Sequence, residues 1–466
     1  MINENGIVLA PEKYYTFSRD GWYLLYDPVN VIWIRLNKDG VKIVELIKEF
    51  KNIDSIIPIL AKEYTQQSKE EVQDKVQLFT NNLVSVGFLH KGQYKMRPIR
   101  HFFQEVPSEI YLLMTYKCNL RCKYCYNIED RTEFDKYKYK YLTYKDYLRL
   151  VDEAGNLGVK KFVFTGGEPL LNHHTLRLGD YIVKKGLESE LITNGLLINK
   201  ANAEKISESF NIITISLDSV NKKLHEHMRG KNTFEKIIRS VGLLKAYNAR
   251  IRINSVITNV NVNTVLNTWR WVIEELDCSH YTPALYAPGT NDPKFYKRFL
   301  PDMKSLIKEQ DNIRKYFKDK PGIAVKYPNI RFSCGIANGE ISVGPEGFVY
   351  PCHTLHKPEM RCGNLMVQNL ERILKESEIL KRLREFNVNE IEVCNKCDFK
   401  YLCGGGCLSM NYNIYGDFYS NNNFYCKYLK QEQIERMWTS SQIPLSHMKK
   451  YLEDSNFNII NPDRTI

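Results

Sequence analysis

The first hundred residues carry two hydrophobic patterns in succession. Apolar runs at 21–26 and 29–35 are rich in aromatic and β-branched residues, which predicts two strands joined by a turn. Helical spacing follows, with Asn37 placed to cap a first helix and a capping box at 68–71 opening a later one. Two strands followed by three helices predict a small α/β unit at 1–98.

Strand and helix patterns then alternate through residues 99–310. The candidate strands are 110–114, 161–164, 187–192, 212–216 and 250–254. A helix capped by Thr143 lies between the first two strands. Alternation at about 30-residue spacing predicts βα units that form a parallel sheet or barrel.

The alternation stops near residue 330, after a bridging region at 311–330. In the last part, 331–466, regular apolar spacing is confined to 369–386 and to a helical tail at 427–452. The loops between carry many cysteines and little apolar surface, so we expect metal ligands to hold them.

The number and clustering of the cysteines indicate what chemistry these elements carry. The 466 residues include 12 Cys, of which three lie at 118–125 and eight at 334–426, leaving Cys278 alone. So long a chain is no small disulfide scaffold, and such clustering indicates metal or Fe–S ligation. The net charge of +12 fits a solvated basic surface, and the alternative interpretation is a binding surface for an acidic partner.

Targeting signals are not apparent in the sequence. The N-terminus has no basic segment followed by an apolar one, and no run of about 18 apolar residues occurs. We therefore expect a protein of the reducing cytoplasm, with no membrane partner and free thiols.

The triplet Cys118-x3-Cys122-x2-Cys125 directly follows a predicted strand. Three thiolates on one loop can hold three irons of a [4Fe–4S] cluster and leave the fourth open for a ligand. A zinc site, the alternative, more often shows two Cys-x2-Cys pairs.

With this triplet the chain resembles the radical S-adenosylmethionine (SAM) enzymes, because further motifs follow in that family's order. They are Thr165-Gly-Gly-Glu-Pro169, Thr193-Asn-Gly195, Ser216-Leu-Asp-Ser219 and Arg229-Gly230. The resemblance implies a partial (βα)6 barrel with its ligands at the carboxyl ends of the strands. It implies catalysis through the cluster on Cys118, Cys122 and Cys125, and SAM contacts by Tyr124, Gly166, Gly167, Glu168, Asn194, Ser216 and Arg229. A glycine pair would let the backbone approach the ligand, and a carboxylate suits its ammonium group.

The later cysteines resemble the seven-cysteine SPASM domain, which holds two auxiliary [4Fe–4S] clusters. The resemblance implies that Cys334, Cys352 and Cys407 bind the first, and that the second is bound by Cys394, Cys397, Cys403 and Cys426. Cys362 departs from that pattern. We predict it as a fourth ligand of the first auxiliary cluster, with a buried thiol as the alternative. Cys278 matches no motif and is expected to be structural.

The segment 1–98 resembles the RiPP recognition element, a winged-helix-like domain that precedes many enzymes modifying ribosomally made peptides. In that family a leader peptide adds a strand to the small sheet. A winged helix can also bind DNA. The helices here carry no dense Arg/Lys cluster, which favours a peptide partner over nucleic acid.

The combined resemblance implies an α/β oxidoreductase with SAM and three [4Fe–4S] clusters, supplied with electrons by a flavodoxin or ferredoxin. The expected reaction is hydrogen abstraction from a precursor peptide and an intramolecular cross-link, a sactionine-type Cys thioether. The alternatives are a carbon–carbon cross-link, formylglycine formation in a sulfatase, and a non-enzymatic Fe–S or zinc regulator that binds DNA.

Overall fold

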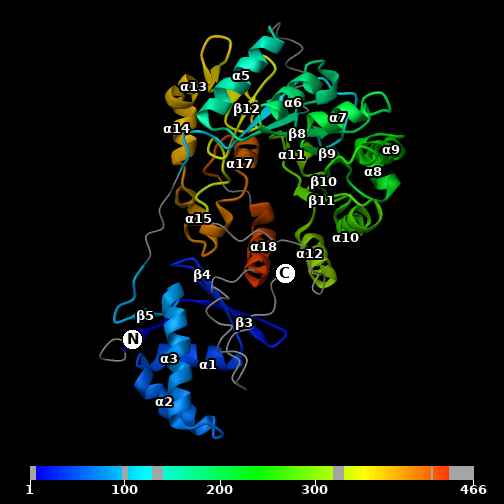
Figure 1. Cartoon of the computed structure of the whole chain (residues 1–466). Helices are drawn as coiled ribbons and strands as arrows, with labels where there is room; N and C mark the ends of the chain where they lie inside the picture. The colour runs from blue at the N-terminus through cyan, green and yellow to red at the C-terminus, as the bar shows by residue number, and fades with distance from the viewer. Residues whose placement is uncertain (1–6, 97–102, 128–139, 318–329, 421–422, 440–466) are drawn as a thin grey trace.

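The computed structural model describes residues 7–96, 103–127, 140–317, 330–420 and 423–439 (Figure 1). The first six residues, most of the bridging region and the end of the predicted helical tail lie outside the described residues. No helix in the described ranges is long and apolar enough to cross a membrane.

The N-terminal unit has the two predicted strands and the three predicted helices, and a third strand joins the two in their sheet. Its antiparallel sheet has the order β2-β3-β4. The elements are β2 (Tyr15–Arg19), β3 (Trp22–Asp27), β4 (Ile32–Leu36), α1 (Lys38–Phe50), α2 (Ile53–Glu63) and α3 (Lys69–Val86). Two short strands, β1 (Val8–Leu9) and β5 (His90–Lys91), pair beside them. Asn37 caps α1 by accepting from the Gly40 N–H, and the capping box at 68–71 opens α3, as predicted.

Six parallel strands form the central part, which confirms the predicted partial (βα)6 barrel. They are β6 (Glu109–Leu113), β7 (Lys161–Thr165), β8 (Glu188–Thr193), β9 (Ile212–Ser216), β10 (Ile251–Ile257) and β11 (His280–Leu285), and they neighbour one another in chain order. Helices α5 (Tyr144–Leu157), α6 (Thr175–Lys184), α7 (Ala203–Ser209), α8 (Lys222–Arg229), α9 (Phe234–Lys245) and α10 (Val265–Arg270) connect them. After β11 come α11 (Pro293–Tyr296) and α12 (Met303–Phe317).

The C-terminal part continues the barrel sheet. Strand β12 (Glu340–Val343) pairs parallel with β6, and the antiparallel β13 (Phe348–Tyr350) and β14 (Gly363–Asn364) follow, giving nine strands in one sheet. The chain then turns through short helices: α13 (Leu370–Glu376), α14 (Glu378–Glu385), α15 (Glu392–Asn395), α16 (Lys400–Cys403), α17 (Leu408–Tyr415) and α18 (Cys426–Thr439).

The N-terminal sheet packs against this C-terminal part. One face of the sheet forms an apolar cluster with the region around α16 and with α18, made of Leu24, Tyr26, Val31, Trp33, Phe399, Leu402, Met437 and Trp438. At its rim Lys13 binds Asp398 and Arg19 binds Glu435, each at 2.6 Å. Figure 1 shows α18 between the N-terminal sheet and the rest of the molecule. The N-terminal unit is therefore docked on the part of the chain that holds the late cysteines.

Candidate active site and metal centres

The first cysteine cluster sits on the loop that leaves β6. The Cys118 Sγ accepts from the Leu120 N–H at 3.4 Å, and the Cys125 N–H donates to the Cys122 carbonyl at 3.4 Å. Burial raises the pKa of Cys122 to about 11, and the Cys125 and Cys118 thiolates add to that rise. Three thiols gathered on one loop fit three irons of a [4Fe–4S] cluster, and iron binding would remove their protons.

The glycine pair after β7 packs against the start of this cysteine loop. The Gly167 N–H donates to the Thr115 carbonyl at 2.7 Å. A Cβ on Gly167 would lie 2.0 Å from the Lys117 oxygen, and one on Gly166, at φ +123°, would lie 2.5 Å from the Thr115 oxygen. These close contacts with the backbone that leads to Cys118 require glycine at both positions. The predicted contact of the two glycines with SAM stays a prediction.

Glu168 is fully buried and joins the ends of two strands. Its carboxylate accepts from the Thr193 hydroxyl at 2.7 Å, the Asn194 N–H at 2.9 Å and the Leu170 N–H at 3.2 Å. Burial raises its pKa, although these donors oppose the rise. Asn194 in turn donates to the Asn119 side chain at 2.7 Å. The second and third motifs thus hold the cysteine loop in place.

A buried ion pair joins the end of α8 to the loop after β9. The Asp218 carboxylate accepts from Arg229 Nε at 2.7 Å and Nη2 at 3.0 Å, and also from the Tyr124 hydroxyl. The Arg229 guanidinium lies 5.6 Å from the Tyr124 ring centroid. Asp218 was not among the predicted site residues, although it lies inside Ser216-Leu-Asp-Ser219. The only sequence signal for it was a carboxylate in a motif that directly follows a predicted strand.

The predicted SAM residues share one edge of the sheet. The glycine pair follows β7, Asn194 follows β8, and Ser216 ends β9 opposite Asn254 of β10. Carboxyl ends of parallel strands form the ligand edge of such barrels. Arg229 is held by Asp218 through Nε and Nη2, and its contact with SAM stays a prediction.

The second set of late cysteines surrounds a cavity of about 410 Å³. Cys394, Cys397, Cys403 and Cys426 all line it, and Cys334 and Cys407 of the first set line it too. Burial raises the pKa of Cys403, and the neighbouring Cys426 and Cys397 add to the rise. Four thiols around one cavity fit a fully ligated cluster. The cavity is also lined by the cations Arg331, Lys400, Lys430 and Arg436, which suit an anionic thiolate cluster.

Two hydroxyls connect the thiols of the first auxiliary set. The Cys352 Sγ lies 3.3 Å from the Thr354 hydroxyl, which donates to the Ser409 hydroxyl at 2.7 Å. The Ser409 hydroxyl lies 3.1 Å from the Cys407 Sγ. Burial, with the nearby Cys407 thiolate, raises the pKa of Cys334 to about 12. The structure therefore brings these three thiols together, as the resemblance implied.

The contacts of Cys362 lie elsewhere. Its Sγ is 3.5 Å from the Met360 carbonyl, and it packs against the barrel core. Burial raises its pKa to about 12, while a hydrogen bond with Ser377 and the charge of Arg384 oppose the rise. This placement favours the buried thiol over the fourth ligand that we predicted. Cys278 is likewise a buried core thiol.

Comparisons with known proteins agree with this geometry. The model of the Radical SAM superfamily matches residues 112–272, and that of the SPASM iron-sulfur cluster-binding domain matches residues 334–398. The chain contains a radical SAM domain and a SPASM domain. Its cofactors are accordingly SAM, the [4Fe–4S] cluster of the barrel and additional clusters in the SPASM domain.

Relatives of this radical SAM/SPASM enzyme include two curated proteins. Over 343 residues it is 26% identical to the antilisterial bacteriocin subtilosin biosynthesis protein AlbA of Bacillus subtilis, covering 69% of this chain and 71% of AlbA. It is also 26% identical, over 355 residues, to the cysteine-type anaerobic sulfatase-maturating enzyme of Clostridium perfringens, covering 67% and 92%.

A solved structure covers more of the enzyme. Streptococcus suis SuiB bound to precursor peptide SuiA superposes with a TM-score of 0.57 at 16% identity, over 90% of this chain and 99% of that one. At that identity the likeness shows the fold.

Proposed function

We propose that this enzyme cross-links a ribosomally made precursor peptide by radical chemistry. The observation that carries the proposal is the N-terminal unit, a small sheet and three helices docked on the SPASM domain. A radical SAM site needs no such unit for SAM cleavage, whereas a peptide substrate needs a place where its leader is held. The precursor peptide bound in the SuiB structure supports the same reading.

The leader is proposed to bind at the edge of the N-terminal sheet. Strands β2 and β4 are its outer strands, so each has one edge that no other strand of the described chain pairs with. Such an edge accepts an extended peptide through backbone hydrogen bonds. The face of the sheet is already covered by Phe399 and Trp438, which leaves the edges as the site for the leader.

The bond formed is proposed to be a thioether between a cysteine sulfur and a carbon of the core peptide. Each link removes two hydrogens from the peptide. One hydrogen atom passes from carbon to 5′-deoxyadenosine, the thiol proton leaves to solvent, and one electron needs an acceptor. When bound, the clusters would supply the electron that cleaves SAM and would accept the electron that thioether formation releases. A carbon–carbon link by the same chemistry is the second candidate, because no described residue of the site selects sulfur.

The chain's own residues bind and orient the reactants. Cys118, Cys122 and Cys125 would hold the barrel cluster, and Arg229 and Asn194, which Asp218 and Asn119 hold in place, would orient SAM. The aromatic cluster that includes Tyr124, Tyr286 and Phe299 would exclude water from the radical.

Two further parts of the proposal concern the setting. A protein that keeps its thiols free for clusters suits the reducing cytoplasm. A flavodoxin or ferredoxin is proposed as the electron donor, because such donors are acidic and this chain carries a net charge of +12.

The decisive experiment uses the full-length, reconstituted enzyme under anaerobic conditions. It is incubated with SAM, a strong reductant and a Cys-rich precursor peptide encoded beside it. We expect 5′-deoxyadenosine and a peptide lighter by two hydrogens per link. Alkylation of the product then distinguishes the two kinds of link. A cysteine in a thioether resists alkylation, whereas a free cysteine in a peptide with a carbon–carbon link does not. An unchanged peptide mass would contradict the peptide proposal, and absence of 5′-deoxyadenosine with intact clusters would favour the DNA-binding regulator.

Leader binding is tested separately by hydrogen exchange on the full chain. We expect the leader to protect edge amides of β2 or β4 and to leave the central β3 unchanged. Protection confined to the barrel would contradict leader binding by this unit. Deletion of residues 1–98 is a poorer test, since it would uncover Phe399 and Trp438 beside the second auxiliary site.

A further inference from the structure

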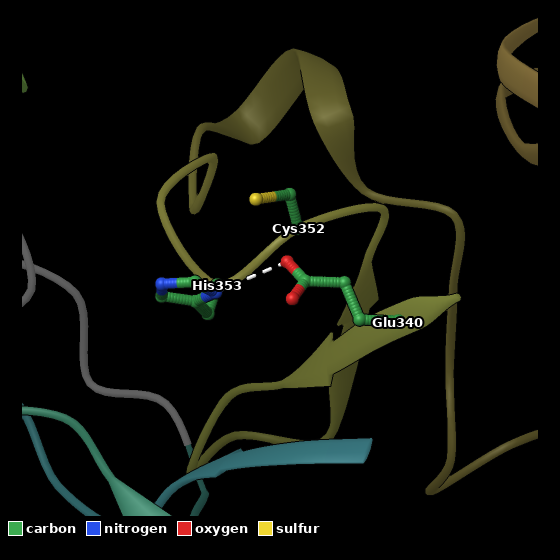
Figure 2. Close-up of side chains that lie close together, drawn as sticks. All are labelled: Glu340, Cys352 and His353. Atoms are coloured by element: carbon green, nitrogen blue, oxygen red, sulfur yellow. Dashed lines mark hydrogen bonds and ion pairs between the residues drawn. The ribbon is translucent and has the colours of Figure 1, made fainter. Parts of the chain in front are cut away.

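Two residues outside the cysteine pattern converge on the first auxiliary site. One ligand atom each from Glu340, Cys352 and His353 lies within 4.8 Å of the others (Figure 2). The Glu340 Oε1 and the His353 Nδ1 are 3.0 Å apart. Because three cysteines leave one iron of a [4Fe–4S] cluster without a protein ligand, a carboxylate at this place needs an explanation.

The backbone carries Glu340 to the cluster thiols. Gly335 and Gly339 close a tight turn, in which the Gly339 N–H donates to the Gly335 carbonyl at 2.8 Å, and Ile336 bridges to Glu340. The ends of this turn bring Glu340 back towards Cys334. Strand β12, which Glu340 begins, pairs with β13, and Cys352 follows β13 by two residues. The carboxylate is therefore placed by the same turn and hairpin that place two of the thiols.

We propose that the Glu340 carboxylate is the fourth protein ligand of the first auxiliary cluster, and that His353 is its positioning residue. The His353 ring stacks on Tyr111 at 4.3 Å and 14°, and meets the edge of Tyr126 at 6.2 Å. A ring held on two sides presents one nitrogen in a fixed direction. Such a histidine–carboxylate contact is a typical way to orient a metal ligand.

The surroundings of Glu340 give a second reason for a metal here. Glu340 is only about one-fifth exposed and lies beside Cys352, with Cys334 and Cys407 close by. Its register partner on β6, Glu109, lies 3.5 Å from Lys161, so that carboxylate has a cation of its own. A carboxylate placed among metal-binding thiols in a partly buried position forms a donor set that a bound cation stabilises.

The proposal is tested on the iron–sulfur centres rather than on the peptide, so it can fail while the proposed function holds. The background is the full chain with Cys118, Cys122 and Cys125 replaced by Ala, which leaves the auxiliary clusters. The variants are Glu340→Gln, Glu340→Cys and His353→Phe, with Cys362→Ser as the matched control. Iron and zinc content, the reduced-state EPR and Mössbauer spectra, and the midpoint potential are measured with and without ¹³C-cyanide.

We expect the parent not to bind cyanide and Glu340→Gln to bind it, with a more positive potential because an anionic ligand is lost. Glu340→Cys should restore a closed site, whether Glu340→Gln opens the cluster or loses its iron. His353→Phe should shift the potential without admitting cyanide, and Cys362→Ser should match the parent.

Three results would overturn the proposal. They are cyanide binding by the parent, a Glu340→Gln variant indistinguishable from the parent, and one zinc per chain that is lost in Glu340→Gln while the iron signals stay unchanged.

Discussion

The two auxiliary sites are built in different ways. The first lies on the nine-stranded sheet, with Cys352 just beyond β13 and hydroxyls joining its thiols. The second is formed by α15, α16 and the start of α18, on a cavity that Cys334 and Cys407 of the first site also line. Helices α15 and α16 have only four residues each, too few to be stable alone. The sheet therefore shapes the first site, whereas the second depends on its metal for its shape.

The difference extends to the N-terminal unit. Its sheet contacts Asp398 and Phe399, which directly follow Cys397, a predicted ligand of the second site. The proposed leader-binding unit thus rests on the site with less backbone support. Loading of the second cluster should influence how firmly that unit is held.

The largest expected effect follows complete removal of metal by a chelator and oxidant. We expect hydrogen exchange to rise at 392–405, in α18 and in β2 to β4, while β6 to β10 and β12 stay protected, since their side chains are in the apolar core. The measurement is exchange mass spectrometry of holo and metal-free protein. Equal loss of protection at both auxiliary sites would contradict the comparison.

Loss of a single thiol at the second site should be the next largest effect. Cys403→Ala removes a cavity ligand, so we expect loss of about four of about twelve irons and a lower Tm. Cys362→Ala is the control, a partly buried cysteine whose contacts lie with Met360 and the barrel core, and it should keep all its iron. Iron analysis and thermal unfolding check both. Equal iron loss in the two variants would show that Cys362 is a ligand after all.

The glycine run between Cys403 and Cys407 gives a smaller effect. Gly404, Gly405 and Gly406 have φ of +70°, +82° and +77°, and a Cβ on Gly404 would lie 2.6 Å from the Ser333 oxygen. Gly416 has φ +80° with open space around it. Gly404→Ala and its control Gly416→Ala should each lower the free energy of unfolding by about 1–2 kcal/mol, because alanine is strained in the left-handed conformation. Gly404→Ala should lower it further because its Cβ would meet the Ser333 oxygen. Denaturant unfolding measures the free energy of unfolding of both variants. Equal losses would contradict the close packing of the cysteine loops at Gly404.

The smallest effect concerns the ion pair at the domain interface. Burial alone would raise the pKa of Asp398, but hydrogen bonds from Lys13 and Tyr15 outweigh it and hold the pKa below its usual value. The stabilisation is therefore present above the ordinary carboxyl pKa near ~4 and is lost as pH falls through the lowered value. Asp398→Asn should cost less than ~1 kcal/mol, and less in high salt.

The control for that variant is Asp277→Asn, which breaks an exposed pair with Lys245 on the barrel. Unfolding of both variants between pH 3 and 7 provides the check. A pH-independent difference between them would rule out the charge as its cause.

Much of this architecture could be predicted from sequence because local signals were strong. Caps at Asn37 and Thr143 and five of the six barrel strands were predicted. The sixth, β11, was not, because His280, Thr282 and Pro283 break its apolar pattern. The partnership of Glu340 with His353 depends on the pairing of β12 with β13, which no motif records. Asp218 was hidden because its role appears only when Arg229 folds back onto it.

The central claim is a leader-guided radical reaction on a peptide, and one measurement addresses it most directly. The full chain is given SAM, reductant and precursor peptide, and 5′-deoxyadenosine is counted against hydrogens lost from the peptide, with Cys122→Ala as control. We predict one 5′-deoxyadenosine for each two-hydrogen loss, little product from a leaderless peptide and none from Cys122→Ala. Equal modification with and without the leader, or 5′-deoxyadenosine with no change in any peptide, would contradict the account.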